Sequence, residues 1–126
     1  MSDRKAVVRL RIVVADDDPD TVNTLRLLLE EEGHEVKTVS DGPAALYAVR
    51  DFGADVLLLD IGMPGMDGYE VARRIRSNPA NRHISLIALT GWGQDEDRQR
   101  SVAAGFNHHL VKPADIEQLR QLLTVA

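Results

Sequence analysis

Several apolar segments of the sequence end at side chains suited to metal or phosphate chemistry. Asp16 and Asp17 follow Leu-Arg-Ile-Val-Val-Ala, Asp60 follows Val-Leu-Leu-Leu, and Thr90 and Lys112 end two later apolar runs. If the segments before Asp16 and Asp60 form neighbouring strands, three carboxylates come together, which requires a cation or raised pKa values. Mg²⁺ fits such a group best, because it binds one or two carboxylates and keeps water and room for phosphate oxygens.

Asp60 is the candidate nucleophile of this group. Carboxylates attack phosphoryl groups when the protein positions them and neutralises the developing charge. Lys112 would place a compact positive charge on the phosphoryl oxygens, and Thr90 would donate a hydroxyl. The backbone carbonyl of Gly62, in the Gly- and Pro-containing loop after Asp60, would complete the metal shell. We therefore expect Asp60 to accept a phosphoryl group.

The elements that must position these residues form five alternating strand–helix pairs. Short β-branched apolar runs predict the strands, at Leu10–Ala15, Glu35–Val39, Asp55–Leu59, Ile84–Leu89 and Phe106–Val111. Apolar residues at helical spacing predict helices over 19–32, 42–52, 68–77, 94–104 and 116–123. Apolar strands alternating with helices indicate a parallel sheet covered on both faces. Ligands of such open sheets bind beyond the carboxyl ends of the strands.

The helix ends carry clear signals. Asp18 before Pro19 predicts a capped helix start, and Asp67 with Glu70 three residues later is the pattern of a capping box. The helix over 94–104 has few large apolar residues, mainly Val102, so we expect it to be the least firmly held.

Size and composition restrict the class of protein. The 126 residues fit one domain, expected over 10–126 after a flexible lead-in at 1–9. The net charge of −5 and the lack of a basic stripe argue against direct nucleic-acid binding. No apolar run approaches the roughly 20 residues of a membrane span, so no membrane insertion is expected. There is no Cys, and a cytoplasmic location is the simplest interpretation.

The sequence resembles the response regulator receiver family, the CheY-like phosphoacceptor domains of two-component signalling. The resemblance covers roughly residues 10 to 125 and is carried by Val13–Asp18, Leu59–Gly68, Ala88–Gly91 and Leu110–Pro113. It implies an α/β fold of the (βα)5 flavodoxin-like class, a doubly wound five-stranded parallel sheet of order 2-1-3-4-5 with helices on both faces.

The resemblance also implies roles for individual residues. Asp60 would be the phosphorylation site, and Asp16 and Asp17 would hold Mg²⁺ with it. Thr90 would be the switch hydroxyl and Lys112 the phosphate-contacting lysine, with a cis Lys112–Pro113 bond. A histidine kinase or histidine phosphotransfer domain would supply the phosphoryl group. Phosphorylation would switch the surface made by the fourth helix, fifth strand and fifth helix, read by a downstream protein or a covalently linked kinase domain. Such a domain is a switch in a phosphorelay and turns over no metabolite.

Two positions depart from or add to the family pattern. His109 stands where members usually carry Tyr or Phe, so signal coupling could become pH-sensitive. Trp92 stands two residues after Thr90, where it would shield the phosphoryl group from water. The runs 88–94 and 105–113 resemble receivers attached to hybrid histidine kinases. A stand-alone regulator and an excised hybrid-kinase domain both stay open.

Two other functions compete with this interpretation. A phosphohydrolase with an aspartyl-phosphate intermediate commonly carries a second acid two residues after the nucleophile, whereas Gly62 stands there in this chain. A pseudo-receiver would be an interaction module that never takes phosphate, and the complete set of acids, threonine and lysine argues against it.

Overall fold

The computed structural model describes residues 9–91 and 95–124, with the side chains of the fourth helix described from Arg98 onward. Strands and helices alternate along the chain. The strands are β1 (Arg11–Ala15), β2 (Glu35–Val39), β3 (Val56–Asp60), β4 (Ser85–Thr90) and β5 (His108–Val111). The helices are α1 (Pro19–Glu31), α2 (Gly42–Phe52), α3 (Gly68–Arg76), the 3₁₀ turn η1 (Pro79–Asn81), α4 (Asp95–Ala104) and α5 (Ile116–Thr124).

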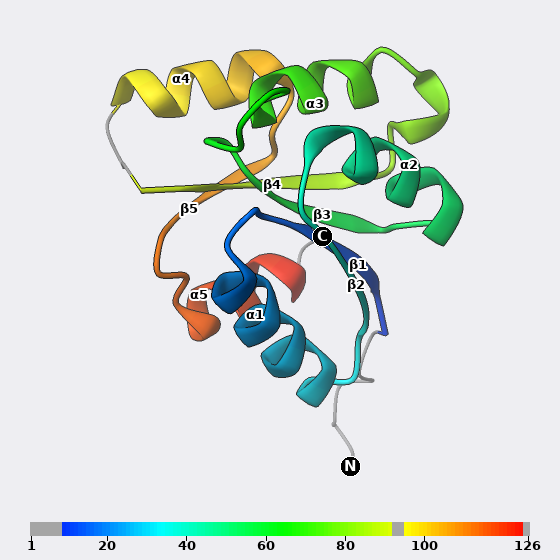
Figure 1. The fold of residues 1–126 in the computed structure, drawn as a ribbon, viewed down its shortest axis with the longest axis vertical. Helices are drawn as coiled ribbons and strands as arrows, with labels where there is room; N and C mark the ends of the chain where they lie inside the picture. The colour runs from blue at the N-terminus through cyan, green and yellow to red at the C-terminus, as the bar shows by residue number, and fades with distance from the viewer. Residues whose placement is uncertain (1–8, 92–94, 125–126) are drawn as a thin grey trace.

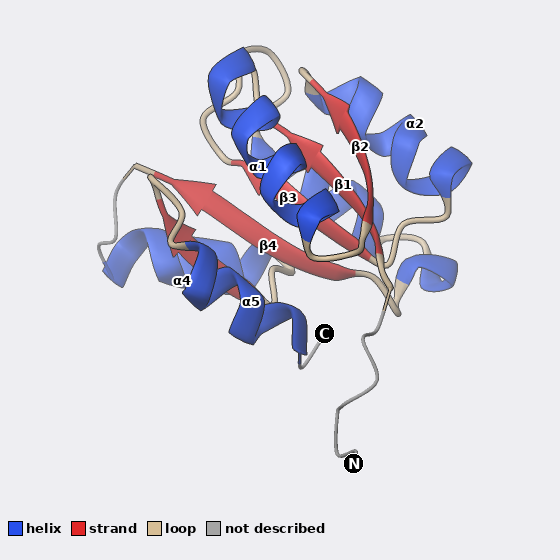
Figure 2. Ribbon diagram, turned by 90° about the horizontal axis from the view of Figure 1, so that it is seen from below, coloured by secondary structure: helices blue, strands red, loops and turns tan. Residues whose placement is uncertain are grey.

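The five strands form one parallel sheet in the order β2-β1-β3-β4-β5, which confirms the expected fold class and strand order. Helices α2, α3 and α4 cover one face of the sheet (Figure 1). Helices α1 and α5 cover the opposite face (Figure 2). β1 and β3 lie side by side at the centre, with Ala15 paired to Leu59. The residues that follow these two strands are therefore neighbours.

The strands are buried on both faces, as a covered parallel sheet requires. Alternate residues point to opposite faces, so Val13 and Leu57 join the core under α2 and α3. Ile12 and Val56, one residue earlier on each strand, join the core under α1 and α5. Each face thus has its own apolar layer, and the central strands are fixed from both sides.

Side-chain caps begin the first three helices. Asp18 accepts a hydrogen bond from the Asp20 N–H, and Asp41 accepts one from the Ala44 N–H. Asp67 accepts from the Glu70 N–H at 3.0 Å, which is one half of the predicted capping box. The Glu70 carboxylate pairs instead with Arg73 and Arg74, so the reciprocal half is replaced by ion pairs along the helix.

Helix α4 is attached mainly at its α3 side. Val102, its main large apolar residue, is 72% exposed and does not anchor it; the smaller Ser101 and Ala104 are buried instead. The Arg100 guanidinium lies 4.2 Å from the centroid of the Tyr69 ring in α3. This sparse apolar contact agrees with the expectation of a lightly held helix.

Arginine 76, at the end of α3, fixes the turn between α4 and β5. It donates to the Gly105 carbonyl at 2.9 Å, to the Asn81 carbonyl at 3.2 Å and to the Asn107 side chain at 2.7 Å. Asn107 also exchanges two hydrogen bonds of 2.8 Å with the Leu86 backbone, one of them through its side-chain oxygen. Because the Asn107 side chain takes the place of one backbone hydrogen bond between β4 and β5, β5 begins at His108 and not at Phe106 as predicted.

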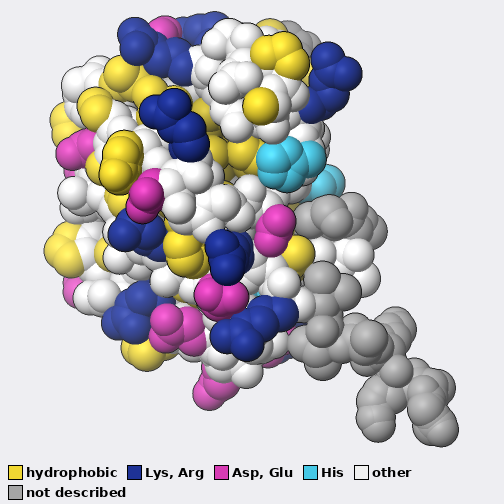
Figure 3. All heavy atoms as spheres, turned by 90° about the vertical axis from the view of Figure 1, so that its right-hand side faces the viewer, with side chains coloured by type: hydrophobic (Ala, Val, Ile, Leu, Met, Phe, Trp, Pro, Cys, Tyr) yellow, Lys and Arg dark blue, Asp and Glu magenta, His cyan; other side chains and the backbone are white. Residues whose placement is uncertain are grey.

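The surface is mixed in character. On the face seen in Figure 3, Lys and Arg side chains are interspersed with Asp and Glu, and hydrophobic atoms occur in separate groups. Among the described residues, none of the helices has the length and apolar content to cross a bilayer.

Candidate functional site

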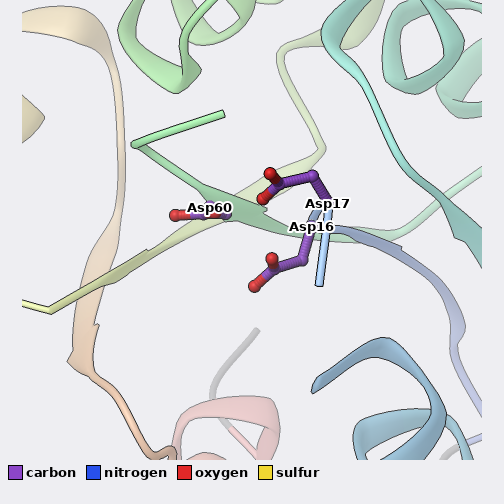
Figure 4. A group of neighbouring side chains, drawn as sticks. All are labelled: Asp16, Asp17 and Asp60. Atoms are coloured by element: carbon purple, nitrogen blue, oxygen red, sulfur yellow. The ribbon is translucent and has the colours of Figure 1, made fainter. Parts of the chain in front are cut away.

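Three carboxylates meet at the carboxyl ends of β1 and β3. Ligand oxygens of Asp16, Asp17 and Asp60 all lie within 4.8 Å of one another. Figure 4 shows Asp16 and Asp17 on consecutive residues with Asp60 beside them on the neighbouring strand. Asp16 is 1% exposed and Asp60 7%, whereas Asp17 is exposed. The in-register pairing of β1 and β3 brings together residues that are 44 positions apart.

One lysine faces two of these acids. The Lys112 Nζ lies 2.7 Å from Asp16 Oδ2 and 3.3 Å from Asp60 Oδ2. Its backbone N–H donates to the Thr90 carbonyl at 2.7 Å, which ties the start of the β5–α5 segment to the end of β4. The Lys112–Pro113 peptide bond is cis. The lysine therefore reaches the acids from a backbone held in place at the same edge of the sheet.

Backbone N–H groups orient the two buried carboxylates. The Asp18 N–H donates to Asp16 Oδ1 at 2.9 Å, and the Gly62 N–H donates to Asp60 Oδ1 at 3.0 Å. In each acid the other oxygen, Oδ2, faces Lys112. The two carboxylates are thus held in fixed orientations before any ligand arrives.

The electrostatics of the site are unbalanced. Burial raises the pKa of Asp60, and the Asp16 charge raises it further, against the lowering effects of the Gly62 N–H and of Lys112. Burial lowers the pKa of Lys112, but the hydrogen bond to Asp16 and the charges of both acids outweigh it, and the net pKa is raised. Three carboxylates facing one ammonium leave two negative charges uncompensated when all are ionised. A hard divalent cation matches both this charge and the all-oxygen donor set, so the residues fit Mg²⁺.

The remaining predicted residues are placed as follows. Thr90 is buried at the end of β4, opposite Val111 in the β4–β5 ladder. His109 pairs with Ala88, and its Nδ1 lies 3.3 Å from the Ser101 Oγ of α4. Its Nε2 is buried and, within the described part of the chain, has no hydrogen-bond partner. Trp92 lies outside the described residues.

Sequence reasoning did not single out Ser101. A serine in a polar helix carries no signal of its own, and its contact with His109 follows only from the packing of α4 over β5. A groove of about 430 Å³ was also not expected. It runs beside the site between α1 and the β5–α5 segment and is lined by Leu25, Leu28, Lys112 and Pro113, among others.

Comparisons with known proteins agree with this architecture. A family model for the response regulator receiver domain matches residues 12–124. The chain is 38% identical over 119 residues to an uncharacterized 14.6 kDa protein of Leptolyngbya boryana, covering 94% of this chain and 91% of that protein. It is 38% identical to the virulence sensor protein BvgS of Bordetella pertussis, covering 97% of this chain and 10% of BvgS. It is 42% identical to the response regulator PleD of Caulobacter vibrioides, covering 83% of this chain and 23% of PleD.

Solved structures show the same fold. The chemotaxis response regulator CheY4 of Vibrio cholerae superposes with a TM-score of 0.87 at 28% identity, covering 94% of this chain and 98% of CheY4. The receiver domain of sensor histidine kinase PA1611 of Pseudomonas aeruginosa superposes with a TM-score of 0.84 at 30% identity, covering 94% and 97%. The latter structure has a magnesium ion coordinated in its active-site cleft. With the family model matched over nearly the whole sheet and its helices, this chain belongs to the response regulator receiver domain family of two-component signalling.

Proposed function

We propose that the chain is a phosphoacceptor in which Asp60 takes a phosphoryl group from a phosphohistidine of a partner protein. The observation that carries this proposal is the convergence of Asp16, Asp17 and Asp60 within 4.8 Å, with the Lys112 Nζ 3.3 Å from Asp60. A nucleophilic carboxylate, an acidic pair for a divalent cation and a lysine for phosphoryl oxygens are the parts that phosphoryl transfer to an aspartate requires.

In the proposed reaction an Asp60 carboxylate oxygen attacks phosphorus, a new O–P bond forms, and the N–P bond to the donor imidazole breaks. The Gly62 N–H holds one Asp60 oxygen, which restricts rotation of the nucleophile. Lys112 already faces Asp60 and would pair with a phosphoryl oxygen as charge builds there. Thr90, at the end of the next strand, would donate its hydroxyl to another phosphoryl oxygen.

Asp16, Asp17, Asp60 and the Gly62 carbonyl would hold Mg²⁺. When bound, this ion supplies a positive charge that neutralises the crowded acids and the phosphoryl oxygens. The PA1611 receiver domain, with magnesium in its cleft, supports this assignment by similarity.

The donor would be a histidine kinase or a histidine phosphotransfer domain. Phosphorylation would shift the equilibrium of the α4–β5–α5 surface, with Thr90 and His109 as switch residues. The sparse anchoring of α4 supports such a shift. The output would be a downstream protein or a linked kinase domain. In this role the chain transmits a signal and converts no metabolite.

The test is labelling by acetyl phosphate, a small phosphodonor, followed by intact-protein mass spectrometry with and without Mg²⁺. We expect an addition of one phosphoryl group that needs Mg²⁺ and is lost in Asp60→Asn. The matched control is Asp18→Asn, which removes one carboxylate beside the site but keeps an N-cap acceptor for α1.

Asp18→Asn is expected to label like the wild type. Wild type that stays unlabelled would support a pseudo-receiver, and label that persists in Asp60→Asn would move the acceptor elsewhere. Steady turnover of small phosphomonoesters would favour the phosphohydrolase alternative.

A further inference from the structure

The first residue of α3 lies directly on the backbone of Asp60. A Cβ atom added to Gly68 would stand 2.7 Å from the Ile61 Cα and 2.9 Å from the Asp60 carbonyl oxygen. Both neighbours are backbone atoms, so neither can rotate away. The Gly68 N–H donates to the Ile61 carbonyl at 3.0 Å, which closes the loop between them. Even one methyl group at position 68 must therefore push the start of α3 and the Asp60–Ile61 peptide apart.

Gly68 is not needed for its backbone conformation. The positive-φ glycines of the described chain are Gly33, Gly53, Gly65 and Gly105, and Gly68 is not among them. In a helical first turn alanine would otherwise be favoured over glycine. The absence of a side chain at position 68 is therefore explained by close approach alone.

A second glycine, Gly42, also packs closely against the loop between β3 and α3. Gly42 is the first residue of α2, and a Cβ added there would lie 2.9 Å from both the Cβ and the carbonyl oxygen of Met66. Like Gly68, it is buried, follows an aspartate cap and lacks a positive φ. It differs in what it touches, because Met66 lies six residues beyond Asp60.

We propose that Gly68 is a positioning residue for phosphoryl transfer: its missing side chain sets the place of the Asp60 peptide, and through it the Asp60 carboxylate. The carboxylate is tied to that backbone by the 3.0 Å hydrogen bond from the Gly62 N–H, and it lies within 4.8 Å of the Asp16 and Asp17 oxygens and 3.3 Å from the Lys112 Nζ. The 2.7 Å distance to the Ile61 Cα is about 0.8 Å short of an ordinary carbon–carbon contact. If α3 and the Asp60 peptide share this shift, Asp60 moves by about half an ångström, and reacting groups misplaced by about 1 Å lose on the order of 100-fold in rate. This inference rests on the proposed function of Asp60.

The experiment compares Gly68→Ala with Gly42→Ala, which introduce the same methyl group with nearly the same overlap at equivalent helix positions. Three properties are measured on each folded variant: urea unfolding, Mg²⁺ affinity by isothermal titration calorimetry, and the labelling rate with acetyl phosphate. We expect both variants to lose stability. Only Gly68→Ala should also lose about tenfold in Mg²⁺ affinity and labelling rate.

Gly68→Ala that binds Mg²⁺ and labels like the wild type would overturn the inference, as would an equal loss in Gly42→Ala. Failure of the wild type to label would instead refute the proposed function.

If Gly68→Ala does not fold, variants of the helix N-caps test whether the start of α3 positions Asp60. Asp67→Ala loosens the first turn of α3 without adding atoms, and Asp41→Ala does the same to α2. Asp67→Ala should weaken Mg²⁺ binding at least twofold, whereas Asp41→Ala should leave it unchanged. Asp67→Asn removes the charge but keeps the N-cap acceptor, and it should also leave Mg²⁺ binding unchanged. Equal Mg²⁺ affinity in all three would overturn the role of α3 in placing Asp60.

Discussion

Lys112 and a divalent cation bound at the proposed site would compete for the same negative charge, and Lys112→Ala separates their contributions. The lysine lies 2.7 Å from Asp16 and 3.3 Å from Asp60, and its side chain is only 27% exposed. Its removal leaves the acids without the cation that faces both of them. The metal-free variant should therefore be less stable than the wild type, and Mg²⁺ should stabilise the variant more than it stabilises the wild type.

The magnitudes follow from the geometry. Removing one partner of a buried ion pair lowers the free energy of unfolding by about 3–5 kcal/mol. Because Lys112 is partly exposed, we expect a loss of about 3 kcal/mol. An ammonium a few ångströms from a divalent cation opposes metal binding by about 2 kcal/mol even at the dielectric constant of water. Its removal should tighten Mg²⁺ binding at least about tenfold. At saturating Mg²⁺, about tenfold tighter binding adds about 1.4 kcal/mol to the free energy of unfolding.

The assay is urea unfolding of both proteins with EDTA and with MgCl₂ raised until the stability of each protein no longer changes. Lys37→Ala, which removes an exposed lysine of β2, is the control and should respond to Mg²⁺ like the wild type. Equal stabilisation of Lys112→Ala and wild type by Mg²⁺ would refute the competition between lysine and metal. Absence of any Mg²⁺ effect on the wild type would refute the metal site.

Two further predictions concern the framework. His34 Nδ1 accepts a hydrogen bond from the Leu10 N–H at 3.1 Å, and burial lowers the pKa of His34 against the opposing charge of Glu32. Because of the lowered pKa, the native state binds a proton more weakly than the unfolded state does. The stability that His34 contributes above the unfolded pKa of about 6.5 should therefore be lost as the pH falls below that value. Urea unfolding between pH 8 and 5 should show this loss, and a His34→Gln variant, which keeps an acceptor, should show less of it; an unchanged pH slope would contradict the assignment. Arg76→Ala removes three hydrogen bonds, two of them at partly buried sites, and should cost about 2–4 kcal/mol. Arg120→Ala should cost less than about 1 kcal/mol, because its hydrogen bonds to Glu32 and Glu117 lie at the exposed surface. A loss for Arg120→Ala that equals that of Arg76→Ala and persists in 1 M NaCl, at which surface charges are screened, would contradict this ranking.

The strands, and the acids at their carboxyl ends, were predictable because they depend on local pattern. A run such as Val-Leu-Leu-Leu ending in Asp60 indicates both a buried strand and a polar residue at its edge. The order of the strands came from family resemblance, since pattern alone does not say which strands are neighbours. Once that order is known, the proximity of Asp16 and Asp60 follows from the register of β1 and β3.

Features that depend on tertiary packing were not predictable. Val102 has the residue type of a core position, yet α4 turns it outward and buries Ser101 instead. Gly68 was predicted only as the first residue of the helix over 68–77, because a sequence does not reveal that this position lies against the Asp60 carbonyl. The later start of β5, at His108, was likewise not predictable, because it depends on the contact between the Asn107 side chain and Leu86. In each case a contact between residues distant in sequence decided the outcome.

The pairing of β3 with β4 divides the site into two halves of opposite chemistry. All three acids of the proposed metal site precede this boundary in the chain, and Thr90 and Lys112 follow it. If the chain were produced as two polypeptides split at His83, in an exposed turn, one fragment would carry the acidic half of the site and the other would carry Thr90 and Lys112. Neither fragment would hold the complete proposed phosphoacceptor site, and the five paired residues of β3 and β4 would reunite the halves only when the fragments are held close together. Fused to two proteins that bind each other, the fragments would make labelling of Asp60 a reporter of that encounter.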